Sequence, residues 1–115
     1  MRAAFLHFAA AILCASVHAA KAERVSLSCR WSGGGEKTEF EFNGDSVRRD
    51  GRVLTNVMVL RVSPVSISYY ADNLAEGGFL EHVTIERSSG RLDWTATRFQ
   101  QSRSATARCE GVNDY

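Results

Sequence analysis

Few residues of this 115-residue chain could carry out catalysis. A nucleophile needs a base beside it, and His82 is the only histidine after residue 20. The chain contains no Gly-x-Ser-x-Gly elbow, and hydrolysis of a glycosidic bond would need a pair of carboxyl groups. A hydrolase would therefore require two of four residues to converge in one pocket, namely Asp72, Glu81, His82 and Asp93. We expect the protein not to be an enzyme.

Two cysteines, Cys29 and Cys109, lie in the part of the chain that is expected to fold. An even number of cysteines in an exported chain predicts a disulfide, and the sequence has no Cys-x-x-Cys motif. Zinc needs three or four ligands, which His82 cannot supply once both cysteines are bridged. We expect a Cys29–Cys109 bond, no metal site and no cofactor.

A first candidate recognition surface contains two adjacent aromatic residues, Tyr69 and Tyr70. Successive side chains of a strand point to opposite faces, so one ring must point away from the buried face. Aromatic rings with polar neighbours are typical of binding surfaces. We predict a binding patch at Tyr69, Tyr70, Asp72 and Asn73.

A second candidate surface is basic. Arg48, Arg49 and Arg52 flank the Asp50-Gly51 dipeptide, which is typical of a hairpin turn. Guanidinium groups bind carboxylates and phosphates through paired hydrogen bonds. We predict a weaker anion-binding patch at these three arginines.

The N-terminal residues have the pattern of a secretory signal. Arg2 is followed by an apolar run over residues 3–17 and then by small residues. This run is shorter than the roughly 20 residues of a membrane-spanning helix. We expect residues 1–19 to be a cleaved signal peptide, with cleavage as late as Ala22, and residues 20–115 to form a single domain, periplasmic or secreted, that does not span a membrane.

Cys14 lies within the expected signal peptide. A lipoprotein signal places a small residue before the modified cysteine, whereas Leu13 precedes Cys14 here. We expect Cys14 to be removed with the signal peptide.

Apolar and polar residues alternate along most of residues 20–115, which is the period of β-strands. Residues 52–62 have apolar side chains at both parities, which predicts a strand buried on both faces or one that bends at a bulge. We predict an all-β fold, a small antiparallel meander of seven or eight strands that forms a barrel or a flattened sandwich. The expected strands cover residues 24–31, 39–42, 46–49, 52–62, 65–70, 79–87, 92–96 and 105–110.

The predicted disulfide restricts how these strands are arranged. Alternation places Cys29 and Cys109 on the inward rows of the first and last strands. These strands should be neighbours or lie across the core, and in a barrel the bond would close the sheet.

Charge argues against nucleic acid as a partner. The chain has 14 basic and 13 acidic residues, and removal of Arg2 makes the numbers equal. A balanced surface does not attract polyanions strongly. We expect the partner to be a protein or a component of the cell envelope.

The segment from Ile85 to Gly90, followed by Cys109, resembles small exported bacterial proteins that share an Ile-x-Arg-x-x-Gly hairpin and a terminal disulfide. This resemblance implies a periplasmic β-domain and no particular activity. The layout is more loosely similar to that of the periplasmic inhibitors of c-type lysozyme, which are disulfide-clipped β-barrels. Their Ser-Gly-x-x-Tyr stretch is absent, because Ser32-Gly33 lacks the tyrosine and Tyr69-Tyr70 lacks the preceding Ser-Gly.

The sequence therefore favours a non-enzymatic binding or inhibitor module that acts in the periplasm. A stable exported domain with few catalytic groups is expected to work through its surface. The alternatives are a structural or accessory protein of the cell envelope and a hydrolase that uses the four residues named above.

Overall fold

The computed structural model describes residues 24–111, so the expected signal peptide and Cys14 lie outside the described residues. Within this range the chain forms one antiparallel sheet of nine strands. The strands are β1 (Arg24–Trp31), β2 (Lys37–Asn43), β3 (Ser46–Arg49), β4 (Arg52–Val53), β5 (Val57–Val62), β6 (Ser66–Asp72), β7 (Leu80–Glu86), β8 (Arg91–Arg98) and β9 (Gln101–Glu110), with one short 3₁₀ helix, η2 (Leu74–Glu76).

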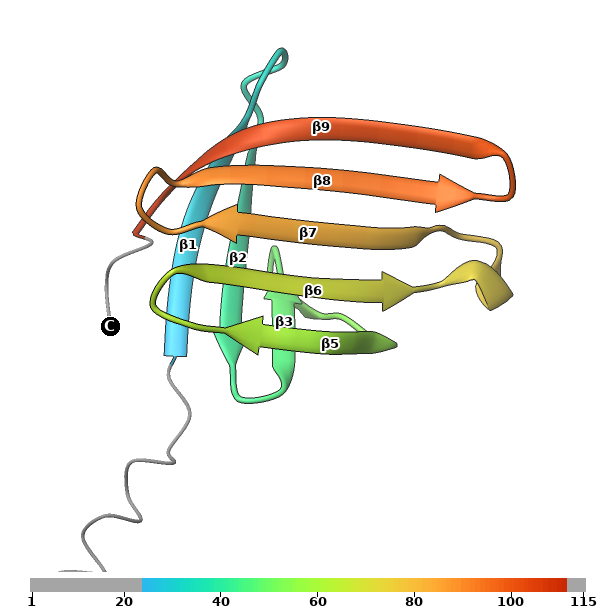
Figure 1. The fold of residues 1–115 in the computed structure, drawn as a ribbon, viewed down its shortest axis with the longest axis horizontal. Helices are drawn as coiled ribbons and strands as arrows, with labels where there is room; N and C mark the ends of the chain where they lie inside the picture. Colours follow the sequence, from blue (N-terminus) through green and yellow to red (C-terminus); the bar gives the residue numbers. More distant parts are fainter. Residues whose placement is uncertain (1–23, 112–115) are drawn as a thin grey trace, which may run out of the picture.

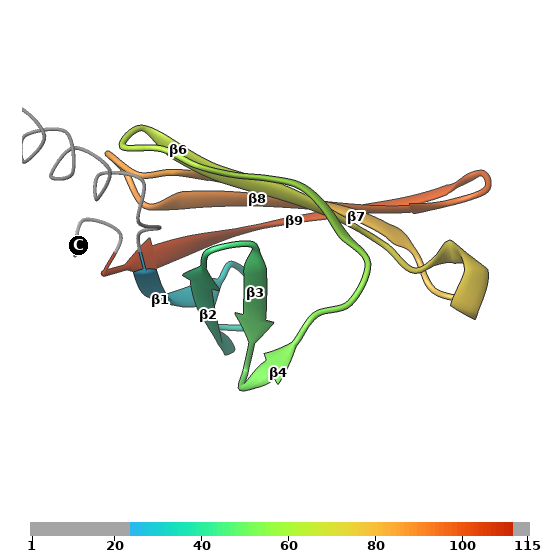
Figure 2. The ribbon, with the colours of Figure 1, turned by 90° about the horizontal axis from the view of Figure 1, so that it is seen from below.

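The sheet curls so that its two halves cross. The order is β4-β3-β2-β1-β9-β8-β7-β6-β5, which places the last strand in the middle. Figure 1 shows β1–β3 running across β5–β9, and Figure 2 shows β1–β4 as a smaller layer below the longer strands. β9 belongs to both halves, because it pairs with β8 along its length and with β1 near its end. The result is a half-barrel with orthogonal packing.

The core lies between these two halves. Alternation turns one side of each strand inward, so that the buried residues follow a period of two. The buried apolar side chains are Val25, Leu27, Cys29, Phe40, Phe42, Val47, Ile67, Tyr69, Ala71, Val83, Ile85, Leu92, Ala96, Ala107 and Cys109.

The all-β, antiparallel prediction is confirmed, but nine strands are present where seven or eight were expected. The difference arises because residues 52–62 form two strands, β4 and β5, at opposite edges of the sheet. The expected bulge is present, since the β5–β6 register shifts between Met58 and Arg61. This break explains why apolar residues occur at both parities in that segment.

The predicted disulfide joins neighbouring strands in the middle of the sheet. Cys29 of β1 lies directly opposite Cys109 of β9, with the two Cα atoms 3.9 Å apart. Both cysteines are buried. The bond therefore crosslinks the ladder through which β1–β4 join β8 and the strands beyond it.

The Ile-x-Arg-x-x-Gly hairpin has a structural role at the turn between β7 and β8. Ile85 is in the core, and the buried Arg87 donates a hydrogen bond from Nη1 to the Ser63 carbonyl, at 2.7 Å. Gly90 has a φ of 79°, and a Cβ placed there would lie 2.4 Å from the carbonyl oxygen of Cys109. The motif thus packs this turn against the β5–β6 loop and the end of β9.

The long strands extend beyond the smaller layer. The segment from Asp72 to Phe79, which includes η2, and the β8–β9 turn at Phe99-Gln100 lie at the same end of the molecule (Figure 1). We call this pair of loops the distal end.

Candidate functional site

A hollow of about 370 Å³ opens where the smaller layer meets the concave face of β8 and β9. Two tryptophans, Trp31 and Trp94, line it, with Ala105 of β9. The polar lining consists of Glu36, Thr38, Arg49 and Asp50, from the β1–β2 loop, β2, β3 and the following turn. We call this the Trp hollow.

The two indoles are fixed by hydrogen bonds. Trp31 donates from Nε1 to the Thr38 hydroxyl at 2.7 Å, and Trp94 donates from Nε1 to Oε1 of Glu81 at 3.2 Å. The rings meet edge to face, with centroids 6.3 Å apart. Because both N–H groups already have partners, the half-buried indoles offer mainly ring surface to a ligand.

An ion pair connects the two layers beside the Trp hollow. The Arg49 Nη1 atom lies 3.0 Å from Oε1 of Glu81, and the guanidinium lies 5.7 Å from the centre of the Phe40 ring. Both charged side chains are mostly shielded from solvent. Glu81 thus holds both Arg49 of β3 and Trp94 of β8.

Tyr69 lies in the core near this ion pair. Its side chain is fully buried, and its hydroxyl has no hydrogen-bond partner among residues 24–111. Burial raises the pKa of Tyr69 to about 12, while the charge of Arg49 opposes the increase and that of Glu81 adds to it. The hydroxyl therefore remains protonated at neutral pH, and it lacks a partner.

The structure divides the predicted tyrosine patch between the two faces of β6, with Tyr69 on the buried face and Tyr70 and Asp72 on the outer face. Tyr69 is in the core, whereas Tyr70 lies on the outer face and stacks on His82, with ring centroids 4.1 Å apart. Asp72 accepts a hydrogen bond from the Leu74 backbone N–H at 3.1 Å. The side-chain amide of Asn56, before β5, donates a hydrogen bond from Nδ2 to Oδ1 of Asn73, at 3.3 Å.

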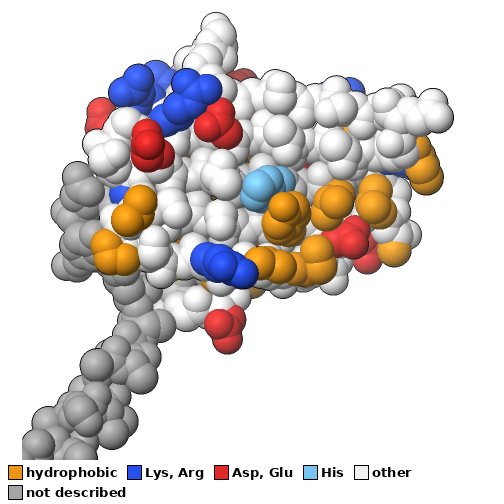
Figure 3. Space-filling model, viewed as in Figure 1, with side chains coloured by type: hydrophobic (Ala, Val, Ile, Leu, Met, Phe, Trp, Pro, Cys, Tyr) orange, Lys and Arg blue, Asp and Glu red, His pale blue; other side chains and the backbone are white. Residues whose placement is uncertain are grey.

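Tyr70 belongs instead to a partly apolar area of the outer face. Met58 lies opposite Tyr70 on β5 and is 41% exposed. Figure 3 shows orange apolar side chains beside the pale blue histidine, over β5–β7 and toward the distal end. This area begins at the Tyr70–His82 stack.

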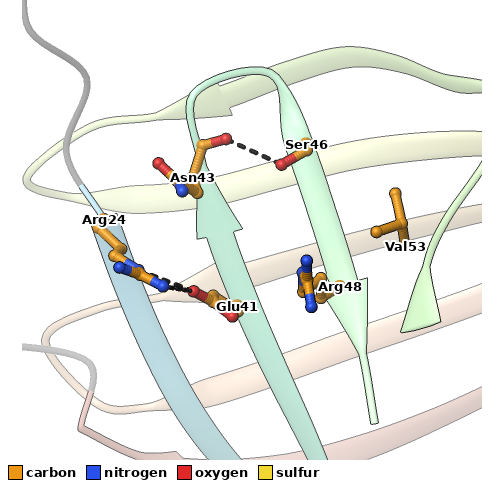
Figure 4. Close-up of a pocket in the computed structure, with 6 residues that line it drawn as sticks. All are labelled: Arg24, Glu41, Asn43, Ser46, Arg48 and Val53. Carbon is orange, nitrogen blue, oxygen red and sulfur yellow. Dashed lines mark hydrogen bonds and ion pairs between the residues drawn. The ribbon is translucent and has the colours of Figure 1, made fainter. Parts of the chain in front are cut away.

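The three arginines of the predicted anion patch do not share one surface. Arg48 points to the outer face, where Figure 4 shows it between Glu41 and Val53 in a shallow pocket of about 210 Å³. Arg49 points to the Trp hollow, and Arg52 lies opposite it on β4 and is exposed. Alternation along β3 separates Arg48 from Arg49.

The outer pocket already contains opposite charges. The Arg24 guanidinium lies 2.6 Å from Oε2 of Glu41, and Ser46 donates a hydrogen bond to the Asn43 carbonyl at 2.9 Å (Figure 4). An anion bound to Arg48 would therefore meet the carboxylate of Glu41 nearby.

Of the four residues considered for hydrolysis, only Glu81 faces inward, whereas Asp72, His82 and Asp93 lie on the outer rows of their strands. Glu81 faces inward and His82 outward, because they are adjacent in β7. The Arg91 side chain donates hydrogen bonds to both carboxylate oxygens of Asp93. The Asp72 carboxylate accepts its hydrogen bond from the backbone N–H of Leu74, the first residue of η2. Among residues 24–111, no three His, Cys, Asp or Glu side chains gather as a potential metal site.

The strongest surface feature of the distal end was missed by the sequence reasoning. Phe99 is 89% exposed at the tip of the β8–β9 hairpin and has a φ of 55°. Leu74 in the neighbouring loop is 41% exposed. The available signal was the single apolar residue in the polar run Arg98-Phe99-Gln100-Gln101.

Comparisons of the chain with family models, curated proteins and solved structures found no match. Within residues 24–111, no helix has the length and apolar character needed to cross a membrane. We therefore infer function from the chain's own geometry.

Proposed function

We propose that this protein is a non-enzymatic binding module of the inhibitor type, which acts on a protein of the cell envelope through its distal end. The observation that carries the proposal is Phe99, the most exposed large apolar side chain among residues 24–111. Export to the periplasm or beyond fits the disulfide, which needs an oxidising compartment to persist.

The position of Phe99 suits insertion into a cavity of a partner. Buried aromatic side chains are common anchors at protein interfaces. Complete burial of such a ring contributes about 1.5–3 kcal/mol. A hairpin tip can enter a cleft that a flat surface of the sheet cannot reach.

Neighbouring contacts hold the hairpin in place before it binds. The Arg98 Nη1 atom donates to the Gly77 carbonyl at 2.7 Å, which ties the β8–β9 turn to the loop that contains η2. The Arg103 guanidinium lies 5.6 Å from the centre of the Phe79 ring. Such ordering reduces the entropy lost on binding.

The test compares two variants that each remove one exposed apolar side chain. Phe99→Ser alters the distal end, and Val65→Ser alters the β5–β6 turn, where Val65 is 71% exposed. The purified domain, with its disulfide intact, is mixed with c-type lysozymes and peptidoglycan hydrolases, and binding and residual activity are measured. We expect the unmodified domain and Val65→Ser to bind and inhibit one target at least tenfold more strongly than Phe99→Ser.

Three results would contradict the proposal. The first is that the unmodified domain inhibits no enzyme tested. The second is that Phe99→Ser inhibits as strongly as the unmodified domain. The third is that Val65→Ser loses as much inhibition as Phe99→Ser. Sedimentation with cell-wall or membrane material regardless of residue 99 would support the structural or accessory alternative instead.

A further inference from the structure

The Trp hollow combines aromatic surface with negative charge. Its lining contains two carboxylates, Glu36 and Asp50, and one cation, Arg49. Arg49 is paired with Glu81, so its charge is largely balanced within the protein. The carboxylates of Glu36 and Asp50 are the remaining charges of the lining.

Both acidic residues are held by the turns that carry them. The Glu39 backbone N–H donates to Oδ1 of Asp50 at 2.8 Å, which leaves the second carboxylate oxygen as an acceptor. The Trp31 backbone N–H donates to the Glu36 carbonyl at 2.8 Å, which fixes the loop next to the indole. The aromatic and acidic parts of the lining are therefore positioned together.

The other arginines of this face lie outside the lining. Arg52 is exposed opposite Arg49 on β4, and the Arg103 guanidinium lies over the Phe79 ring toward the distal end. Directly opposite residues of an antiparallel pair point to the same face, so Arg52 adds its charge beside Arg49. The charges at the Trp hollow are therefore the carboxylates of Glu36, Asp50 and Glu81 against the two guanidinium groups, which leaves one negative charge in excess.

The buried hydroxyl of Tyr69, which has no hydrogen-bond partner among residues 24–111, lies near the Arg49–Glu81 pair but outside the lining of the Trp hollow.

We propose that the Trp hollow binds an organic cation, that is, an alkylammonium or guanidinium group. A cation over an indole face is attracted by the ring electrons within about 6 Å. Glu36 and Asp50 add charge attraction, which a neutral sugar cannot use and an anion would oppose. The volume of about 370 Å³ is suitable for a small ligand or a single long side chain.

This site is separate from the distal end and can be tested independently. The chain has two tryptophans, and both line the Trp hollow, so intrinsic fluorescence reports directly on its occupancy. The domain is titrated with choline, with its neutral isostere 3,3-dimethylbutan-1-ol, with glucose and with acetate. N-acetyl-lysine amide and N-acetyl-arginine amide test a basic side chain as the source of the cation.

We expect saturable fluorescence changes with choline or with one of the two amides, and binding of the neutral isostere at least tenfold weaker. Glu36→Gln should weaken cation binding at least fivefold, whereas Glu76→Gln, an exposed acidic residue in η2, should leave it unchanged. Phe99→Ser should also retain cation binding, which separates this proposal from the proposed function.

The proposal is overturned if no cation gives a saturable change or if the isostere binds equally well. Preference for glucose would assign the Trp hollow to sugars instead. Unchanged cation binding in Glu36→Gln, with circular dichroism confirming that the variant is folded, would place the cation elsewhere.

Discussion

At the scale of single residues, Gly90 is the glycine where an added Cβ would lie closest to another backbone atom. Its φ is positive, and an added Cβ would lie 2.4 Å from the Cys109 carbonyl oxygen. We expect Gly90→Ala to lower the free energy of unfolding by about 2–3 kcal/mol, measured by urea denaturation. Gly34→Ala is the matched control, because its Cβ would meet nothing within 4 Å. Equal stability of the two variants would contradict this prediction.

Tyr69 should make stability depend on pH in the alkaline range. The pKa of Tyr69 is raised to about 12 in the folded protein, whereas a free tyrosine has a pKa near 10. Above pH 10 the unfolded chain loses this proton while the folded protein retains it, so stability falls as pH rises from 10 to 12. The full difference corresponds to about 2–3 kcal/mol.

The measurement is urea denaturation between pH 9 and pH 12, with Tyr69→Phe as the comparison. The variant lacks the ionising group, so its stability should fall less over this range. At pH 7, Tyr69→Phe should be at least as stable as the unmodified domain, because it removes a buried hydroxyl without a partner. Parallel pH profiles would show that Tyr69 is not the group responsible.

At the scale of strands, the sequence predicts the core-facing elements better than those that extend into solvent. β1 was predicted at its observed bounds, because Val25, Leu27 and Cys29 share one buried face. The halves of β8 and β9 nearest the distal end have no such buried face. Residues 97–104 are mostly exposed, so no apolar alternation marks the strand.

The Trp hollow could not be predicted from local patterns either. Trp31 and Trp94 are in contact but come from strands far apart in the sequence, and the same is true of Arg49 and Glu81. Their contacts depend on how the sheet curls, and side-chain alternation does not specify the curl. Alternation did predict that Tyr69 and Tyr70 point to opposite faces, but not which of the two is buried.

The bulge in β5 is expected to store backbone strain. Val59 has a φ of 52°, and this left-handed conformation costs a side-chain-bearing residue about 1–2 kcal/mol. Val59 is 55% exposed, so little apolar burial is lost with its side chain. We expect Val59→Gly to match the unmodified domain in urea denaturation or to exceed it by up to about 1 kcal/mol.

Val57→Gly is the control for this strand. Val57 is half-buried against the core, so the same substitution should destabilise by at least about 1 kcal/mol. If Val59→Gly lowered the free energy of unfolding as much as Val57→Gly does, the bulge would not be strained.

At the scale of the whole molecule, the position of the disulfide decides how the fold is held together. The ladder between β1 and β9 contains four residue pairs, and Cys29–Cys109 is one of them. Through this short ladder, the strands β1–β4 join β8 and the long strands beyond it. Across 80 residues, the bond is expected to contribute about 4–5 kcal/mol by restricting the unfolded chain.

Because small domains have a total stability of about 5–15 kcal/mol, loss of this bond should remove a large part of it. We expect Cys29→Ala/Cys109→Ala to lower the free energy of unfolding by about 4–5 kcal/mol, with one transition seen by both tryptophan fluorescence and far-ultraviolet circular dichroism. A single transition is expected because the core residues of both layers pack together, so neither half retains a core alone. Two separate transitions would show that the halves do not share one cooperative core. A loss below about 2 kcal/mol would show that packing rather than the bond holds them together.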